Sequence, residues 1–247
     1  MEDGQLNNTV GFVIQVRMGS TRFPRKSLMP IPLYSDIPLL KRITDCLQKT
    51  KFKSKIVVAT SNNKENDSIH DFCSNNNIDC YRGDEDNVLS RFIEITKKNN
   101  FSCVVRLTGD NPIFDISILD NVIETHLKKE NDYTKTVNLP IGMNHEVISS
   151  NSLLQMNKVE LLDELEHVTL NIIRNSKIKK EEIFYDLPKE ISSLRLTIDY
   201  YSDFLLISTI FGLFDKNKLN GLEGIRNVYD KYPWIFTINA ENEQLNI

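Results

Sequence analysis

Short apolar runs alternate along the first 130 residues with segments in which apolar side chains recur every three or four positions. Nearly continuous apolar runs of this length are typical of strands buried on both faces. Such runs lie at residues 11–16, 55–60 and 102–107, with a shorter one at 78–82. Helical spacing is found at residues 38–49, 66–76, 87–98 and 117–127. We expect Asp86 or Asn87 to cap the third of these helices and Ser117 the fourth.

Beyond residue 130 the alternation is less regular. Further strands are predicted at residues 133–137, 145–148, 183–185 and 194–198, and further helices at 202–214 and 222–232. Strands that alternate with crossover helices predict a three-layer α/β fold with a mainly parallel, mixed sheet. We expect one domain over residues 10–247, preceded by a flexible tail at residues 1–9.

Composition and charge narrow the class of protein. The 247 residues carry 30 Lys and Arg against 34 Asp and Glu, a net charge of −4, which argues against nucleic acid as a partner. No apolar run approaches the roughly 18 residues of a membrane-spanning helix, so we expect no membrane insertion. The four cysteines have no CxxC spacing and no secretory segment is recognised, so reduced thiols in a cytoplasmic protein are expected.

The loop after the first strand carries the strongest chemical signal. Ligands of such sheets gather beyond the carboxyl ends of the strands, and Val16 is followed there by three cations, two hydroxyls and a glycine: Arg17, Arg22, Lys26, Ser20, Thr21 and Gly19. Backbone amides next to glycine, together with cations, are suited to hold a polyphosphate. The spacing matches neither a P-loop nor a dinucleotide fingerprint. A solvated basic loop is the alternative.

Two aspartates follow later strands. Asp110 comes after the 102–107 strand, behind Thr108 and Gly109, and Asp199 comes after the 194–198 strand. Carboxylates at two strand ends are suited to hold one Mg²⁺ over a triphosphate, although each is equally well explained as a turn or helix-capping residue. Asp203 is in a position to cap or start the next helix.

An ordered set of motifs covers nearly the whole chain and resembles a known family. The motifs are Val13–Lys26 (VIQVRMGSTRFPRK), Ile56–Ser61 (IVVATS), Tyr81–Arg91 (YRGDEDNVLSR), Val105–Pro112 (VRLTGDNP), Glu166–Thr169 (EHVT) and Leu196–Asp199 (LTID). Together they resemble the spore coat polysaccharide type of cytidylyltransferase, a relative of the 3-deoxy-manno-octulosonate and acylneuraminate cytidylyltransferases. The resemblance implies a Rossmann-like nucleotidyltransferase fold.

The resemblance also implies a reaction and a site. CMP would pass from CTP to a sugar acid, a nonulosonic or 3-deoxy-ulosonic acid, with release of pyrophosphate for surface polysaccharide synthesis. Arg17, Arg22 and Lys26 would be catalytic, and Asp110 and Asp199 would hold Mg²⁺. Nucleotide contacts would come from Val16, Gly19, Ser20, Thr21, Ala59, Thr60, Ser61, Arg82, Gly83, Asn87, Arg91, Thr108 and Gly109.

On the acceptor side the implied residues are Asn111, His145, Glu146 and His167, although a histidine in such a position is more often packed or at the surface. The subregion at residues 139–188 would cap the sugar side or form the contact of a homodimer. One departure from the family pattern is Arg25, which stands where the family usually has a glycine before the lysine. Arg25 either adds a phosphate contact or points to solvent.

Several other functions remain open from the sequence. A phosphorylated polyol or amino-alcohol acceptor would give a CDP product, and a non-catalytic nucleotide-binding module would keep the pocket. A glycosyltransferase of related fold should carry Asp-x-Asp where this chain has Gly109-Asp110-Asn111, and it should lack the basic loop. An NAD-dependent oxidoreductase would need the absent glycine fingerprint.

Overall fold

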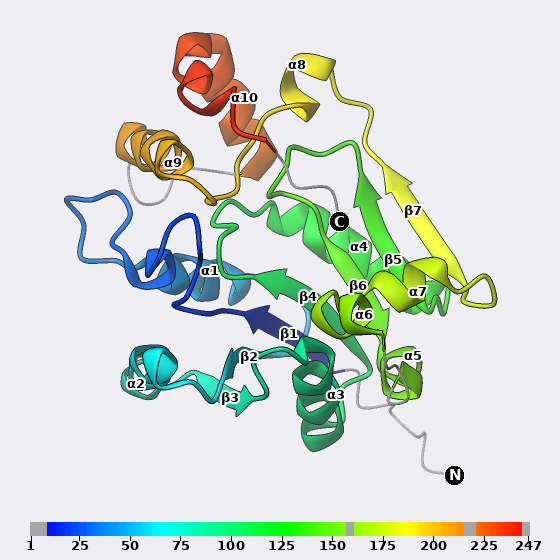
Figure 1. Cartoon of the computed structure of the whole chain (residues 1–247). Coiled ribbons are helices and arrows are strands. Elements are labelled where there is room, and N and C mark those ends of the chain that lie inside the picture. The colour runs from blue at the N-terminus through cyan, green and yellow to red at the C-terminus, as the bar shows by residue number, and fades with distance from the viewer. Residues whose placement is uncertain (1–8, 157–160, 215–220, 244–247) are drawn as a thin grey trace.

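A seven-stranded mixed sheet forms the centre of the molecule (Figure 1). A computed structural model describes residues 9–156, 161–214 and 221–243. The strand order is β3-β2-β1-β4-β6-β5-β7. The strands are β1 (Val10–Gln15), β2 (Ser54–Ser61), β3 (Asp79–Gly83), β4 (Cys103–Thr108), β5 (Tyr133–Val137), β6 (Glu146–Ser149) and β7 (Lys180–Phe184). The expected tail at 1–9 lies almost entirely outside the described residues.

The first four strands are parallel, and β1 lies between β2 and β4. β6 runs antiparallel to β4 and to β5, while β7 is parallel to β5. The mainly parallel, mixed sheet predicted from the alternation of strands and helices is therefore confirmed. Because β1 and β4 are parallel neighbours, the loops that follow them leave the same edge of the sheet.

Helices cover both faces of the sheet, which gives the three layers (Figure 1). Side chains alternate along β1, so Phe12 and Ile14 pack on one face and Val13 on the other. The first face is covered by α1 (Leu39–Leu47), α2 (Asp67–Asn75), α4 (Ile116–Lys128), α8 (Lys189–Ser192), α9 (Tyr201–Leu213) and α10 (Gly221–Lys231). The second is covered by α3 (Val88–Asn99), α5 (Ser150–Gln155), α6 (Leu162–Glu166) and α7 (Leu170–Arg174).

Residues 194–198 do not form the predicted strand. They make one isolated parallel bridge, between Arg195 and Ile141. The Ile141 amide donates to the Leu194 carbonyl at 2.9 Å, and the Leu196 amide donates to the Ile141 carbonyl at 2.7 Å. Leu194, Leu196 and Ile198 are nevertheless buried, because the segment packs into the core beneath α9. Gly142 permits this close approach: its φ is +96°, and a Cβ there would lie 2.7 Å from the Leu196 backbone. Burial, and not sheet pairing, explains the apolar run.

The helix caps correct one expectation and confirm another. Asn87 caps α3 by accepting a hydrogen bond from the Ser90 amide at 2.8 Å. The cap of α4 is Asp115, whose carboxylate accepts from the Ile118 amide at 3.0 Å. Ser117, the predicted cap, is already inside that helix.

Among the described helices, none combines the length and apolarity that crossing a bilayer requires.

Candidate active site

A cavity of about 530 Å³ opens at the carboxyl ends of β1 and β4. The basic loop after β1, the turn after β4 and the end of the segment before α9 meet there. Its walls are formed by Gln15, Val16, Arg17, Ser20, Thr21, Arg22, Lys26, Ser27, Arg106, Thr108, Gly109, Asp110, Glu166, His167 and Asp199. All three cations of the predicted loop and both predicted metal ligands therefore lie in one cavity.

Lys26 joins the three segments. Its side chain is only 8% exposed, and its ammonium lies 3.0 Å from Asp110 Oδ2 and 3.3 Å from Asp199 Oδ1. The same nitrogen donates to the Ile198 carbonyl. A single buried cation is thus shared by two carboxylates that are 89 positions apart in the sequence, and each partner removes part of the cost of burying the others.

Asp199 is the most strongly compensated acid of the site. Burial alone would raise the pKa of its carboxyl, but Lys26, Arg22 and Arg195 outweigh burial and lower it. Arg22 lies 3.2 Å from Oδ1, and Arg195 lies 2.7 Å from Oδ2. The carboxylate is therefore held ionised, in the state that can bind a cation.

Asp203, next to this group, has a positioning role. It is fully buried and accepts hydrogen bonds from the backbone amides of Asp199 and Tyr200, both at 2.9 Å. It also pairs with Arg195 at 3.1 Å. Of the two expectations, that Asp203 caps or starts the helix, the structure matches the first: α9 begins at Tyr201, and the Asp203 side chain in its first turn completes a capping box with the N-cap residue Tyr200. By holding the backbone of the turn, Asp203 fixes the direction of the Asp199 side chain.

The basic loop is fixed from two sides. The Phe23 ring packs on Tyr201 and Phe204 of α9, with centroid separations of 4.4 and 5.4 Å, and Figure 1 shows α9 beside the loop. From the other side, buried Asn66 accepts a hydrogen bond from the Met18 amide at 2.8 Å. These contacts hold the loop in place without a ligand.

The backbone conformation of Arg25 explains why the family usually has a glycine at this position. Its φ is 63° and its ψ 9°, the left-handed conformation that glycine adopts freely and other residues only at a cost. The turn starts the short 3-10 helix η1 (Lys26–Leu28) and so directs Lys26 inward. The Arg25 side chain is exposed on the outer wall of the loop, which favours the second of the two roles expected for it.

The donor set fits a hard divalent cation. Asp110 and Asp199 already converge on one positive group, the Lys26 ammonium. Within the described ranges no group of three or more His, Cys, Asp or Glu side chains forms a metal cluster. Mg²⁺ commonly takes one or two carboxylates and completes its shell with water and substrate phosphates, so two aspartates are sufficient.

The residues expected around the base and ribose lie beside the cavity and do not line it. Ala59, Thr60 and Ser61 are buried at the end of β2. Arg82 pairs with Asp67 at 2.7 Å. Gly83 is packed against the Arg91 side chain, which is also buried.

Arg91 and Gly19, two more of the residues expected to contact the nucleotide, also lie next to the cavity. Burial lowers the pKa of the Arg91 guanidinium, Glu85 opposes this effect, and the charge of Arg17 adds to it. Arg91 therefore lies within electrostatic reach of the cavity. Gly19 lines an adjoining hollow on the outer side of the basic loop.

On the acceptor side the four expected residues have different positions. His167 lines the cavity. Glu146 lies behind the wall, 2.7 Å from Arg106, and Asn111 bonds to Thr108 Oγ1 at 2.9 Å. His145 is 1% exposed and its ring stacks on Phe114. Of the four, only His167 lines the cavity, and the expected contact between His145 and the sugar stays a prediction.

Four lining residues were not predicted: Gln15, Ser27, Arg106 and Glu166. Arg106 had a usable signal, because it is the one charged residue in the apolar run 102–107. A cation in a buried strand needs a polar partner or a polar cavity, and Arg106 has both. Glu166 belongs to the Glu166–Thr169 motif, of which the resemblance places only His167 on the acceptor side.

A basic loop opposite paired carboxylates is typical of enzymes that transfer groups from nucleoside triphosphates. Residues 12–218 match the sequence model of the family described as cytidylyltransferase. Since the match covers most of the chain, the protein belongs to this family and is a nucleotidyltransferase.

Individual relatives agree with this assignment. The chain is 34% identical over 209 residues to the spore coat polysaccharide biosynthesis protein SpsF of Bacillus subtilis, covering 83% of this chain and 87% of that protein. A solved cytidylyltransferase from Leptospira borgpetersenii superposes with a TM-score of 0.84 at 26% identity, over 96% of this chain and 99% of the other.

Two more distant structures share the fold. A CMP:2-keto-3-deoxy-manno-octonic acid synthetase complexed with CTP gives a TM-score of 0.61 at 12% identity, covering 83% of this chain and 99% of the other. A Mycobacterium tuberculosis protein in complex with manganese gives 0.58 at 12% identity, covering 82% and 98%. The predicted Rossmann-like nucleotidyltransferase fold is confirmed.

The conformation of Arg25 generates a first prediction. Arg25→Gly is expected to melt at the temperature of the unchanged protein or slightly higher, whereas Arg25→Val should lower the free energy of unfolding by about 1–2 kcal/mol, because a β-branched residue is strained at this φ. Chemical denaturation of both variants checks this. Equal stabilities of the two variants would show that the left-handed turn at residue 25 is not a constraint.

The position of Lys26 generates a second prediction. In Lys26→Met the carboxylates of Asp110 and Asp199 lose their shared cation, so the metal-free protein should lose about 1–3 kcal/mol of stability. A divalent cation would then bind without displacing an ammonium, and we expect Mn²⁺ to bind at least ~10-fold more tightly, as measured by the electron paramagnetic resonance signal of free Mn²⁺. Lys41→Met, which alters a cation paired with Asp45 on α1, is the control. Unchanged Mn²⁺ affinity in Lys26→Met would contradict the competition.

Proposed function

We propose that the protein is a Mg²⁺-dependent cytidylyltransferase that transfers CMP from CTP to a sugar acid and releases pyrophosphate, for surface polysaccharide synthesis. One observation carries the proposal: Lys26, Arg22 and Arg17 share a cavity with Asp110 and Asp199 at the ends of β1 and β4. Cations for a triphosphate and oxygen ligands for a divalent cation are thereby brought together. The CTP complex of a structure with the same fold supports the choice of nucleotide.

The reaction is an in-line displacement at the α-phosphorus of CTP. The acceptor hydroxyl loses its proton to water, and its oxygen forms the new bond to phosphorus. The bond between the α-phosphorus and the bridging oxygen breaks, and the electron pair leaves with pyrophosphate. Arg17, Ser20 and Arg22 would bind the triphosphate, and Lys26 would stabilise negative charge on the leaving oxygen. Asp110 and Asp199 would hold Mg²⁺, which offsets phosphate charge when bound.

The nucleoside would lie on the β2 side of the cavity. β2 and β3 follow β1 in the sheet as parallel neighbours, and at their ends Ser61 and Gly83 are register partners. Thr60 supports this placement, because its buried hydroxyl has no hydrogen-bond partner among the described residues. Arg91 and Asn87, at the start of α3, follow the same strand ends.

The acceptor would lie on the opposite side, against β4. Arg106 is the cation of that wall, and Glu146 pairs with it from behind at 2.7 Å. The buried Nε of Arg106 has no hydrogen-bond partner among the described residues. An arginine held in this way matches a carboxylate geometrically, which supports a sugar acid as the acceptor. His167 and Glu166 line the same end and would contact its hydroxyls.

The proposal also includes a cytoplasmic location, where CTP is made, and a homodimer. Apolar side chains are exposed within the expected cap and dimer subregion at 139–188, namely Leu161, Leu162, Ile173 and Phe184. Four exposed apolar side chains within one subregion support the dimer contact. Residues 157–160 of the subregion lie outside the described residues.

The proposed roles of Lys26 and Asp110 generate a third prediction. Lys26→Ala and Asp110→Asn should each lower pyrophosphate release from CTP at least ~100-fold, the usual effect of losing one electrostatic contact in the transition state. The unchanged enzyme should require Mg²⁺ or Mn²⁺ and prefer CTP to ATP, GTP and UTP. Lys97→Ala, on the exposed side of α3, is the control. Near-normal turnover in either site variant would exclude that residue from the mechanism.

Arg106 generates a fourth prediction. Arg106→Leu should raise the KM for the acceptor at least ~10-fold through loss of a charge-assisted hydrogen bond, with little change in the KM for CTP. The assay compares a nonulosonic acid, a 3-deoxy-ulosonic acid and a phosphorylated polyol, and Lys135→Leu on β5 is the control. If only the polyol phosphate supports pyrophosphate release, the product is CDP-linked and the sugar-acid assignment is wrong, whereas the cytidylyltransferase assignment stands.

A further inference from the structure

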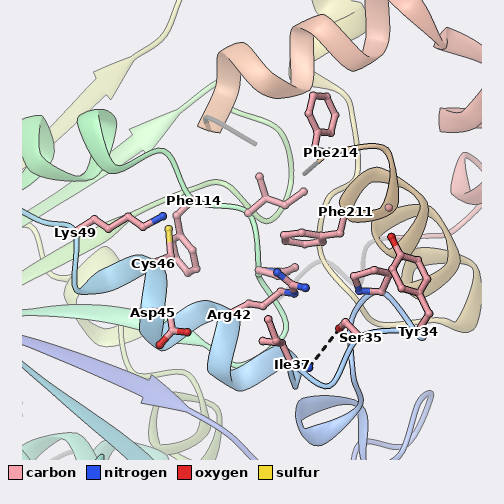
Figure 2. A pocket seen from close by; sticks show the side chains of 14 residues that line it. Tyr34, Ser35, Ile37, Arg42, Asp45, Cys46, Lys49, Phe114, Phe211 and Phe214 are labelled. Carbon is pink, nitrogen blue, oxygen red and sulfur yellow. Dashed lines mark hydrogen bonds between the residues drawn. The ribbon is translucent and has the colours of Figure 1, made fainter. Parts of the chain in front are cut away.

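A second cavity, of about 430 Å³, lies between α1, α9 and the loop that follows β4 (Figure 2). It shares no lining residue with the cavity described above. Its volume is within the range of small-molecule sites in proteins. The proposed transfer reaction has no use for it.

Aromatic side chains from three segments of the chain surround this cavity. Phe211 and Phe214 come from the end of α9, Phe114 from the loop after β4, and Tyr34 from the loop before α1. In Figure 2 these rings are arranged around the cavity. Phe114 is fixed from behind, because its other neighbour is the buried His145 ring at a centroid distance of 6.1 Å. Rings in this arrangement provide flat apolar walls for another ring.

Two cations of the α1 segment, Arg42 and Lys49, also line the cavity. The Arg42 Nε donates to the Ile31 carbonyl, and the guanidinium lies 4.6 Å from the centroid of Phe211. Neither cation has a carboxylate within ion-pair distance in the part of the chain that the structure describes. Asp45, the acid of this wall, is paired with Lys41.

Burial makes the charged form of Arg42 less favourable. Burial lowers the pKa of the Arg42 guanidinium, and the smaller effects of Tyr34 and Asp45 oppose this without cancelling it. No residue of the described ranges hydrogen-bonds to the terminal nitrogens of Arg42, and a half-buried cation of this kind gains free energy when an anion pairs with it. Lys49 is exposed at the end of the same wall and adds a second positive charge.

We propose that this cavity is a binding site for a small planar aromatic anion, a ring that bears a carboxylate, sulfonate or phosphate. The ring would lie against Phe114 and Phe211, and the anionic group would pair with Arg42 and Lys49. An uncharged ring would leave the cation unpaired, and a small anion without a ring would leave the aromatic walls in water. The combination therefore selects a ligand that carries both groups.

Two fluorescent probes that differ in charge test this proposal on the full chain: the aromatic sulfonate 8-anilinonaphthalene-1-sulfonate and its uncharged counterpart N-phenyl-1-naphthylamine. The sulfonate should bind at least ~10-fold more tightly than the uncharged probe. Arg42→Gln with Lys49→Gln should weaken the sulfonate at least ~10-fold, a loss of about 1.4 kcal/mol, and leave the uncharged probe unchanged. Lys97→Gln, which removes a cation of α3, should have no effect.

Lys49→Gln alone is the second variant, since its side chain is exposed and is not needed for folding; it should weaken the sulfonate at least ~3-fold. Saturating CTP with Mg²⁺ should not displace the probe, because the two cavities share no residue. Equal binding of the two probes, unchanged sulfonate binding in the double variant, or displacement by CTP would each overturn the proposal.

Discussion

The shared ion pair of Lys26 with Asp110 and Asp199 is the interaction on which the rest of the site depends. Its three members come from the loop after β1, the turn after β4 and the segment before α9, and the ammonium lies within 3.3 Å of both carboxylates. Two aspartates that both lie this close to one nitrogen would repel each other in a partly buried cavity if the cation between them were removed. Lys26 thus keeps the metal ligands close together in the protein that has no ligand.

A buried second layer holds this pair in position. Asp203 binds two backbone amides of the turn that carries Asp199, and it shares Arg195 with that residue. Asn239, from the 3-10 helix η4 (Pro233–Asn239), donates to Asp203 at 2.8 Å. Because these groups are buried and mutually bonded, the C-terminal third of the chain contributes directly to the geometry of a site that is formed mainly by its first half.

Burial patterns allowed most of the fold to be predicted, and the same patterns explain the errors. The runs at 11–16, 55–60 and 102–107 are central strands, where both faces are covered. Residues 194–198 are as apolar but pack beneath α9 without sheet partners, and a periodicity argument cannot separate these cases. In the site, the convergence of Asp110 and Asp199 depends on tertiary packing. The burial of His145 depends on a contact with Phe114 that no local motif encodes.

The loop after β4 connects the two cavities. Asp110 lines the first cavity, and Pro112, Ile113 and Phe114 line the second. Between them the chain has little freedom: the Asp110 carbonyl accepts from the Ile198 amide at 3.0 Å, and Phe114 is packed between the second cavity and His145. Dense packing of this kind leaves the segment little room to shift. The same short segment therefore fixes the position of Phe114 in one cavity and of an aspartate of the shared ion pair in the other.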